Sequence, residues 1–219
     1  MQNENKLFYI FGKGKLAKDF IDFLLKNIDK KNIIVIPELP EPSWTESLVE
    51  YCNELGIKLT SFSDVTIRTH ESIGISIYFS KIFKQELIDK FEYFVNLHNG
   101  PLPRYRGVNP INWALKNKEK QHGVTLHTIE SGIDTGKILD QIMFPINDDM
   151  EVIDVYNLCL SNGIKILERS IFNLDNIEPI KQDDSFSTYY SKKDFEKLGD
   201  RKYFTCLLYT SDAADEHGC

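Results

Sequence analysis

The first forty residues alternate between short apolar runs and a helical pattern. Residues 7–11 (LFYIF) form an apolar run that breaks at a Gly-Lys-Gly turn, residues 12–14. After the turn, Leu16, Phe20, Phe23 and Leu24 fall on one face of a helix. A second apolar run, residues 33–36 (IIVI), stops at Pro37. A strand, a glycine turn, a helix and another buried strand predict the opening of a parallel α/β sheet.

The same reading continues to about residue 174. Helices are predicted over residues 45–55, 83–90, 109–116 and 151–174, and strands over residues 57–62, 73–79, 93–97, 124–129 and 137–146. Thr45 is the expected N-cap of its helix, which Gly56 ends, and Pro110 occupies a first turn. The last two strands are joined like a hairpin. We therefore predict an α/β fold with a Rossmann-like, mostly parallel central sheet flanked by helices, followed by a C-terminal β-hairpin and a long helix.

Charge and composition restrict the class of partner. The chain has 219 residues and a formal net charge of −7, so nucleic acid and membrane surfaces, both polyanionic, are disfavoured as partners. No apolar run approaches the roughly 20 residues that span a bilayer, and the N-terminus does not have the pattern of a signal peptide. We therefore expect a cytoplasmic protein.

Metal ligation is not expected. The four cysteines, Cys52, Cys159, Cys206 and Cys219, lie far apart without metal-ligand spacing, which favours free thiols in a reducing compartment. The histidines His70, His122 and His127 have no partner four residues on. His127 is expected at the surface or just outside the site, because its side chain alternates outward from Val124 and Leu126.

The C-terminal residues break the pattern before them. Residues 206–216 (CLLYTSDAADE) resemble the in-frame translation of a sequencing-library adapter. We therefore expect a single domain over residues 1–205, truncated at its C-terminus, and a non-native tail over residues 206–219.

The candidate chemistry lies between residues 95 and 135. Asn96 and His98 are two residues apart at a strand end, so their side chains share one face. The carboxyl end of a parallel strand is where such sheets place a ligand crevice. A turn-rich loop follows, and a later acidic loop returns with Asp134. An amide, an imidazole and a carboxylate brought together by loops indicate a site for acyl chemistry.

The glycine turn at residues 12–14 has two interpretations. It either cradles a phosphate at a helix N-terminus or makes a tight strand-to-helix turn, and the second is favoured. Ala17 stands where a dinucleotide fingerprint has its third glycine, and no acidic residue clearly ends the second strand. These departures disfavour an NAD-type oxidoreductase.

Three linked motifs carry a family resemblance. They are Asn96-Leu-His98, the loop Leu102-Pro-Arg-Tyr-Arg-Gly107, and Asp134-Thr-Gly136. In this order they resemble the 10-formyltetrahydrofolate-dependent formyltransferases, over about residues 7–193. The loop departs from the common HxSLLP form, because this chain reads HNGPLP from His98. The departure changes packing residues and leaves the catalytic positions intact.

The resemblance extends to one branch of this family. An Arg-Gly pair, here Arg106-Gly107, is less typical of the glycinamide enzymes than of methionyl-tRNA formyltransferases and of enzymes that formylate nucleotide-linked amino sugars. The segments PINWALKN and GVTLH look most like the sugar branch, and the acidic charge agrees. The expected function is transfer of a formyl group from 10-formyltetrahydrofolate to the primary amine of a nucleotide-linked amino sugar for surface polysaccharide. The alternatives are methionyl-tRNA formylation and a nucleotide-binding module without catalysis.

The resemblance implies roles for single residues. Asn96 donates to the developing oxyanion, and His98 donates as imidazolium or orients the carbonyl. Asp134 favours the charged form of His98, and whether His98 or Asp134 takes the amine's proton stays open. One of the peptide bonds before Pro101 and Pro103 is expected to be cis.

Ligand contacts are also implied. The folate is expected at Ser80, Lys81, Ile82, Phe83, Ile133 and Asp134, and the acceptor at Tyr105, Arg106, Gly107 and Lys13. For Tyr105 and Arg106, bracing of the loop is an equal alternative. A thymidine diphosphate sugar is the expected acceptor, a homodimer the expected assembly, and nucleic acid, membrane and metal are not expected partners.

Overall fold

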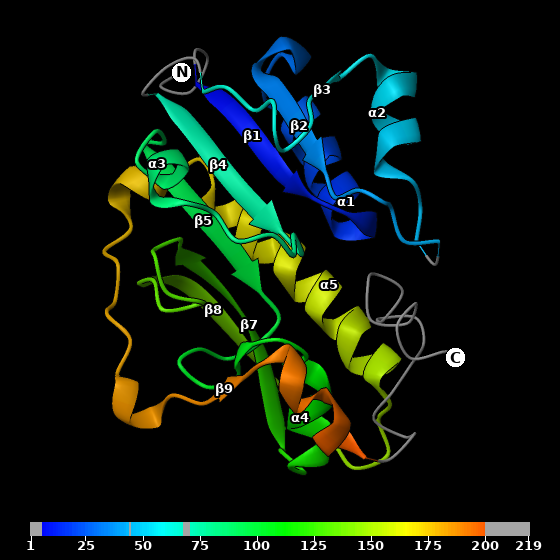
Figure 1. Ribbon diagram of the computed structural model, residues 1–219, viewed down its shortest axis with the longest axis vertical. Helices are drawn as coiled ribbons and strands as arrows, with labels where there is room; N and C mark the ends of the chain where they lie inside the picture. The colour runs from blue at the N-terminus through cyan, green and yellow to red at the C-terminus, as the bar shows by residue number, and fades with distance from the viewer. Residues whose placement is uncertain (1–5, 44, 68–70, 200–219) are drawn as a thin grey trace.

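A computed structural model describes residues 6–43, 45–67 and 71–199. Its centre is a seven-stranded sheet in the order β3-β2-β1-β4-β5-β7-β8 (Figure 1). The strands are β1 Leu7–Gly12, β2 Ile33–Pro37, β3 Lys58–Leu59, β4 Ser72–Ile77, β5 Tyr93–His98, β7 Gln121–Thr128 and β8 Ile138–Pro145. The helices are α1 Gly14–Leu25, α2 Leu48–Leu55, α3 Gln85–Ile88, α4 Pro110–Lys116 and α5 Val152–Ser170.

Strand direction divides the sheet into two parts. From β3 to β5 all neighbours are parallel, whereas β7 pairs antiparallel with β5 and β8 pairs antiparallel with β7. The mostly parallel sheet, the closing hairpin and the long helix are therefore confirmed. Among the described residues, no helix has both the length and the apolarity needed to cross a bilayer.

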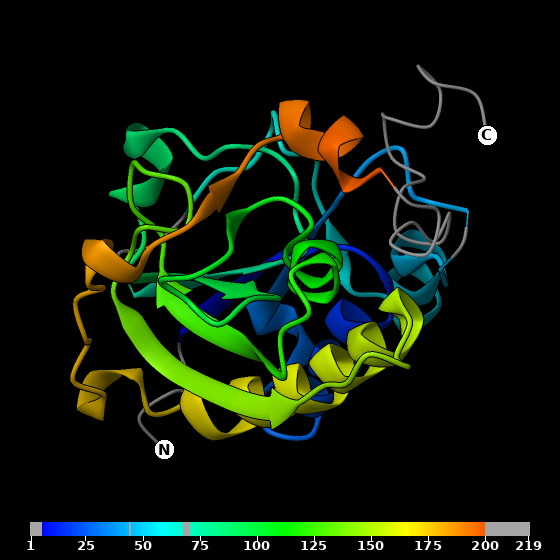
Figure 2. The same ribbon diagram turned by 90° about the horizontal axis from the view of Figure 1, so that it is seen from below.

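Both faces of the sheet are covered, as the alternation along β1 shows. Phe8 and Ile10 join a core cluster with residues of α1 and α5. Tyr9 and Phe11 point to the opposite face and join a second cluster rich in phenylalanine. Helices α1 and α5 lie together on the first of these faces (Figure 2). A strand buried on both faces explains why the run at residues 7–11 is continuously apolar.

The start of α2 differs from the prediction. The N-cap is Ser47, not Thr45, because the Ser47 hydroxyl accepts from the backbone N–H of Glu50 at 3.1 Å. A carboxylate oxygen of Glu41 accepts from the N–H of Leu48, the first residue of the helix, at 2.6 Å. Gly56 ends the helix in the left-handed conformation, as predicted.

Three other elements are shorter than predicted. The third strand stops at Leu59, because residues 61–64 fold into a turn in which the Asp64 N–H donates to the Ser61 carbonyl at 3.2 Å. Helix α3 covers only Gln85–Ile88. Helix α5 ends at Ser170, and Leu174 belongs to a separate 3₁₀ turn. Leu174 is nevertheless buried, so it has the apolar character of a helix position although it lies beyond the helix.

A second, small sheet was not predicted. Strand β6, Arg106–Gly107, pairs in parallel with β9, Tyr189–Tyr190. We call residues 177–190 the strap, because this segment runs back along the β8 side of the molecule and across the loop that carries β6 (Figure 1). The polar, turn-rich tail is thus joined to the central loop by hydrogen bonds.

Candidate active site

The predicted trio of side chains meets at the end of β5. His98 Nδ1 lies 3.6 Å from one carboxylate oxygen of Asp134. The other oxygen lies 3.5 Å from Nε2 of His127. The amide nitrogen of Asn96 lies 3.1 Å from the same His127 nitrogen. The structure therefore brings Asn96, His98 and Asp134 together, with His127 as a fourth member.

Of the two positions expected for His127, the surface is wrong, and the position just outside the site agrees with its contacts to Asn96 and Asp134. The residue is 2% exposed and pairs with Asn96 in the β5–β7 register. Its alternation suggested an outward direction, but that face of β7 is covered by the loop that carries Asp134. A β-bulge between Leu126 and His127 accompanies this arrangement. The burial of His127 follows from how β5, β7 and the Asp134 loop pack together, and the periodicity of a single sequence does not show such packing.

Hydrogen-bond chemistry fixes the tautomers of the two imidazoles. His98 Nε2 lies 2.7 Å from the Tyr105 carbonyl, which only accepts, so Nε2 carries a proton. In neutral His98 the unprotonated nitrogen is therefore Nδ1, which faces Asp134. His127 Nδ1 donates to the Thr128 carbonyl at 2.8 Å, and its Nε2 lies between the Asn96 amide nitrogen, at 3.1 Å, and Asp134. The Asn96 amide has a second N–H for another acceptor.

Burial and neighbouring charges keep His98 neutral and Asp134 ionised near neutral pH. Burial lowers the pKa of His98 below 6.5, and this outweighs the neighbouring Asp134, which raises it. Burial also opposes ionisation of Asp134, but His98, His127 and the Gly107 N–H together hold the pKa of that carboxyl below its usual range. Near pH 7 the site thus holds a neutral His98 and an ionised Asp134. The expectation that Asp134 would favour charged His98 is correct in sign, but burial is the stronger effect.

The Asp134 loop is held by the loop of β6. The Gly107 N–H donates to Asp134 Oδ2 at 2.8 Å. Asp134 itself has a φ of 53°, a left-handed conformation that aspartate tolerates better than most residues. Of the predicted acceptor contacts, Gly107 therefore contacts the candidate catalytic carboxylate directly.

Tyr105 and Arg106 contact other parts of the chain. The Tyr105 hydroxyl donates to Glu119 at 2.6 Å, and the Tyr105 N–H donates to the Thr188 hydroxyl at 2.7 Å. Arg106 donates to side chains of the strap and is 8% exposed. These contacts agree with the alternative in which Tyr105 and Arg106 brace their loop, and their contact with the acceptor stays a prediction.

Lys13 and Ser80 meet at a buried carboxylate, that of Glu38, which was not predicted as a site residue. Glu38, directly after β2, is 4% exposed and accepts from the Ser80 backbone N–H at 2.7 Å and from the Ser80 hydroxyl. Lys13 Nζ lies 3.7 Å from the same carboxylate. The statement that no acidic residue ends the second strand is therefore wrong. A proline usually stops a strand, but Pro37 pairs with Gly12 as the last residue of β2, so Glu38 directly follows the strand.

The other predicted folate contacts lie on two loops. Phe83 packs in the aromatic cluster, and Lys81 Nζ lies over the Phe62 ring. Ile82 is 74% exposed and Ile133 is 45% exposed. Exposed apolar side chains on loops fit the flat ring of a folate, and their contact with it stays a prediction.

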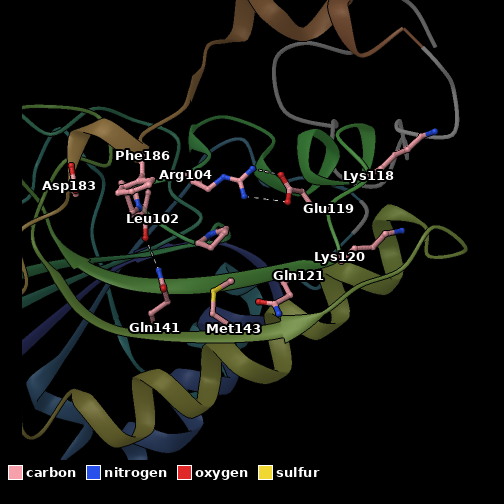
Figure 3. A pocket seen from close by; sticks show the side chains of 12 residues that line it. Leu102, Arg104, Lys118, Glu119, Lys120, Gln121, Gln141, Met143, Asp183 and Phe186 are labelled. Atoms are coloured by element: carbon pink, nitrogen blue, oxygen red, sulfur yellow. Dashed lines mark hydrogen bonds and ion pairs between the residues drawn. The ribbon is translucent and has the colours of Figure 1, made fainter.

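The proline loop has the predicted cis bond, at Leu102–Pro103, and Leu39–Pro40 is also cis. A cavity of about 620 Å³ lies beside this loop (Figure 3). Figure 3 shows Gln141 pointing toward Leu102, whose carbonyl accepts from the Gln141 amide at 2.9 Å. Asn96, His98 and Asp134 are not among the residues that line this cavity.

The remaining titratable candidates are buried in the core or lie outside the described part. Burial lowers the pKa of His122 to about 4 and raises that of the Cys52 thiol to about 12. Cys52 and Cys159 are free and buried. His70, Cys206 and Cys219 lie outside the described residues. Within the described ranges no three metal-ligating side chains are grouped for an ion.

The fold and site define a class of protein. The family model described as formyl transferase matches residues 65–171. Two solved structures of N-formyltransferases are 33% and 34% identical to the chain, which covers 70% and 71% of them. The chain therefore belongs to the formyltransferase family.

Particular relatives come from two branches. One of the two structures is WlaRD, a sugar 3N-formyl transferase in the presence of dTDP and 5-N-formyl-THF, with a TM-score of 0.81 over 86% of this chain. The other is the N-formyltransferase of Helicobacter canadensis in complex with folinic acid and dTDP-3-aminofucose, with a TM-score of 0.79 over 85% of this chain. The methionyl-tRNA formyltransferase of Clostridium tetani is 38% identical over 55% of this chain. The chain spans only 40% of that relative's length.

Proposed function

We propose that this protein transfers a formyl group from 10-formyltetrahydrofolate to the primary amine of a nucleotide-linked amino sugar, with a thymidine diphosphate sugar as the first candidate. The observation that supports this most is the meeting of Asn96, His98 and Asp134 at the carboxyl end of β5. The similarity to sugar N-formyltransferases over 85–86% of the chain supports the substrate class. A cytoplasmic homodimer remains part of the proposal.

The chain's own residues divide the work of the reaction. When bound, the folate supplies the activated formyl group. The free N–H of Asn96 donates to the formyl oxygen as negative charge develops on it. His98 Nδ1 accepts a proton from the attacking amine, and Asp134, 3.6 Å away, stabilises the imidazolium that results. The imidazolium then gives this proton to the folate nitrogen as the bond between that nitrogen and the formyl carbon breaks.

The choice of His98 over Asp134 as first proton acceptor follows from their pKa values. Asp134 is a poor base, because its neighbours hold its pKa below the usual range. Burial keeps His98 neutral near pH 7, so Nδ1 has a lone pair for the proton. A base whose pKa lies nearer to the working pH is the more effective one.

The test is a formyl-transfer assay against thymidine-linked 3-amino and 4-amino dideoxy sugars, with their uridine-linked counterparts beside them. We expect transfer to at least one thymidine-linked sugar. Binding of folate and nucleotide sugar without any transfer would instead support the non-catalytic module.

Methionyl-tRNA formylation is the second candidate. The curated relatives favour it, because the Clostridium tetani and Clostridium novyi enzymes are 38% and 33% identical over 55% and 65% of this chain. The net charge of −7 opposes a polyanionic acceptor. The same assay with methionyl-tRNA as acceptor separates the two, since preference for the tRNA would reject the sugar proposal.

We expect the rate of transfer to fall as the pH is lowered through the pKa of His98, which lies below 6.5. Protonation fills the lone pair of Nδ1 and removes the base. The kcat/KM of the protein measured from pH 5 to 8 should therefore rise with pH and level off below pH 7. A rate that increases on acidification would show that the imidazolium is the active form.

Replacing Asn96 with alanine should lower kcat by about 10²- to 10³-fold, the typical cost of losing one oxyanion donor. Asn162→Ala is a suitable control, because the Asn162 side chain bonds to neighbours on its own helix α5, donating to the Leu158 carbonyl and accepting from Lys165. A kcat for Asn96→Ala close to that of the control would remove Asn96 from the mechanism.

A further inference from the structure

The strap contributes one buried amide to the candidate active site. Gln182 is 5% exposed, and its carbonyl oxygen accepts from Arg106 Nε at 3.0 Å and from a terminal Arg106 nitrogen at 2.8 Å. Its amide nitrogen donates to the carbonyl of Asp134 at 2.8 Å and to that of Gly136 at 2.6 Å. Both lone pairs and both N–H groups of the carboxamide are therefore used.

These partners permit only one orientation of the amide. A guanidinium only donates and a backbone carbonyl only accepts, so a flipped amide would lose all four hydrogen bonds at once. Arg106 is further fixed by Asp184, which lies 2.7 Å away in the strap. Because unmet polar groups are costly inside a protein, Gln182 locks its two neighbouring loops in one relative position.

Asp134 is held by two hydrogen bonds, one from Gln182 and one from the loop that Gln182 fixes through Arg106. Gln182 holds its backbone carbonyl, at a residue whose φ is 53°. Gly107, the residue after Arg106, holds its carboxylate. The backbone and the side chain of Asp134 are thus fixed through adjacent residues that Gln182 ties together.

We propose that Gln182 is a positioning residue for Asp134, and that its carboxamide sets the distance between the Asp134 carboxylate and His98. This inference deepens the proposed function and rests on it for its effect on turnover. Gln182 lies outside residues 65–171, the segment that the formyl transferase model matches.

The test compares two variants of Gln182. Gln182→Met keeps the length of the side chain and loses all four hydrogen bonds. Gln182→Glu keeps one acceptor oxygen for Arg106 but turns its second oxygen, in place of the NH₂ group, toward the carbonyls of Asp134 and Gly136. Gln121→Met is the matched control, because Gln121 is exposed at the start of β7.

Two measurements are made on each folded variant. The first is the formyl-transfer rate, where we expect kcat to fall about 100-fold in both variants with a smaller change in KM, because a displacement near 1 Å costs this much. The second is the imidazole titration of His98 followed by ¹⁵N NMR, which needs no turnover. The titratable groups that act on His98 are Asp134 from the β7–β8 loop and His127 from β7, and His122 on β7 is coupled to it.

Displacing Asp134 removes the charge that favours protonated His98. In Gln182→Met the His98 midpoint should therefore fall below that of the wild type, whereas Gln121→Met should leave it unchanged. An unchanged midpoint in Gln182→Met, or normal transfer by Gln182→Glu, would overturn the inference. If the wild-type protein transfers formyl to no acceptor, the proposed function fails, and the His98 midpoint still decides the role of Gln182.

Discussion

Replacing Asp134 with asparagine should lower kcat by about 10²- to 10⁴-fold, the range expected when an acid–base pair loses one member. Asparagine has nearly the same shape, so it can still accept from the Gly107 N–H, which now donates to Asp134 Oδ2 at 2.8 Å. It carries no charge, however, and cannot stabilise the imidazolium that forms at His98, 3.6 Å away. The measurement is single-turnover transfer under saturating substrates.

The control for this variant is Asp148→Asn. Asp148 forms a surface ion pair with Lys120 at 2.7 Å, and such pairs contribute little to stability. Its kcat should equal that of the wild type. If Asp134→Asn also keeps a near-normal rate, Asp134 has no part in the proton transfer.

Replacing Gly107 with alanine should strongly destabilise the protein. Gly107 has a φ of 90°, and a Cβ there would lie 2.1 Å from the Tyr190 carbonyl oxygen. That oxygen accepts from the Val108 N–H at 2.9 Å, so the β6–β9 pairing would have to open. Backbone strain alone costs about 1–3 kcal/mol, and the clash adds to it. Denaturant unfolding should show a clearly lower midpoint, together with loss of transfer.

Gly56→Ala is the control that separates the cost of the left-handed backbone from the cost of the clash with Tyr190. Gly56 has a similar left-handed φ of 64°, but the nearest atom to a new Cβ is the flexible Lys30 Nζ at 3.5 Å. Its loss of stability should therefore be the smaller of the two, with transfer unaffected. Equal losses in both variants would mean that the contact with Tyr190 is unimportant.

Local patterns were sufficient to predict most of the sheet. The run at residues 7–11 is apolar at every position because both faces of β1 are covered, and a glycine turn leads directly into α1. The spacing of Asn96 and His98 placed both side chains on one face of β5, where the structure has them. These features depend on neighbours in sequence, which is why they can be read from it.

Contacts between distant segments could not be predicted in the same way. Arg106 pairs with Tyr189, and strands of two residues have too few positions to show a period. The neutral state of His98 follows from its burial, which depends on the packing of the loops around it. The burial of His127 depends on such a contact as well, since the Asp134 loop lies over its side chain.

Glu38 changes what the first half of the sheet is able to recognise. In dinucleotide-binding folds, an acidic residue after the second strand holds the ribose hydroxyls of the cofactor. Here both oxygens of that carboxylate are taken by the chain itself, through Ser80 and the neighbouring Lys13. An adenosine ribose would have to compete with the protein's own serine. The position that binds a ribose in dinucleotide-binding folds is thus an internal brace in this chain, where the carboxylate holds the loop of Ser80 against the end of β2.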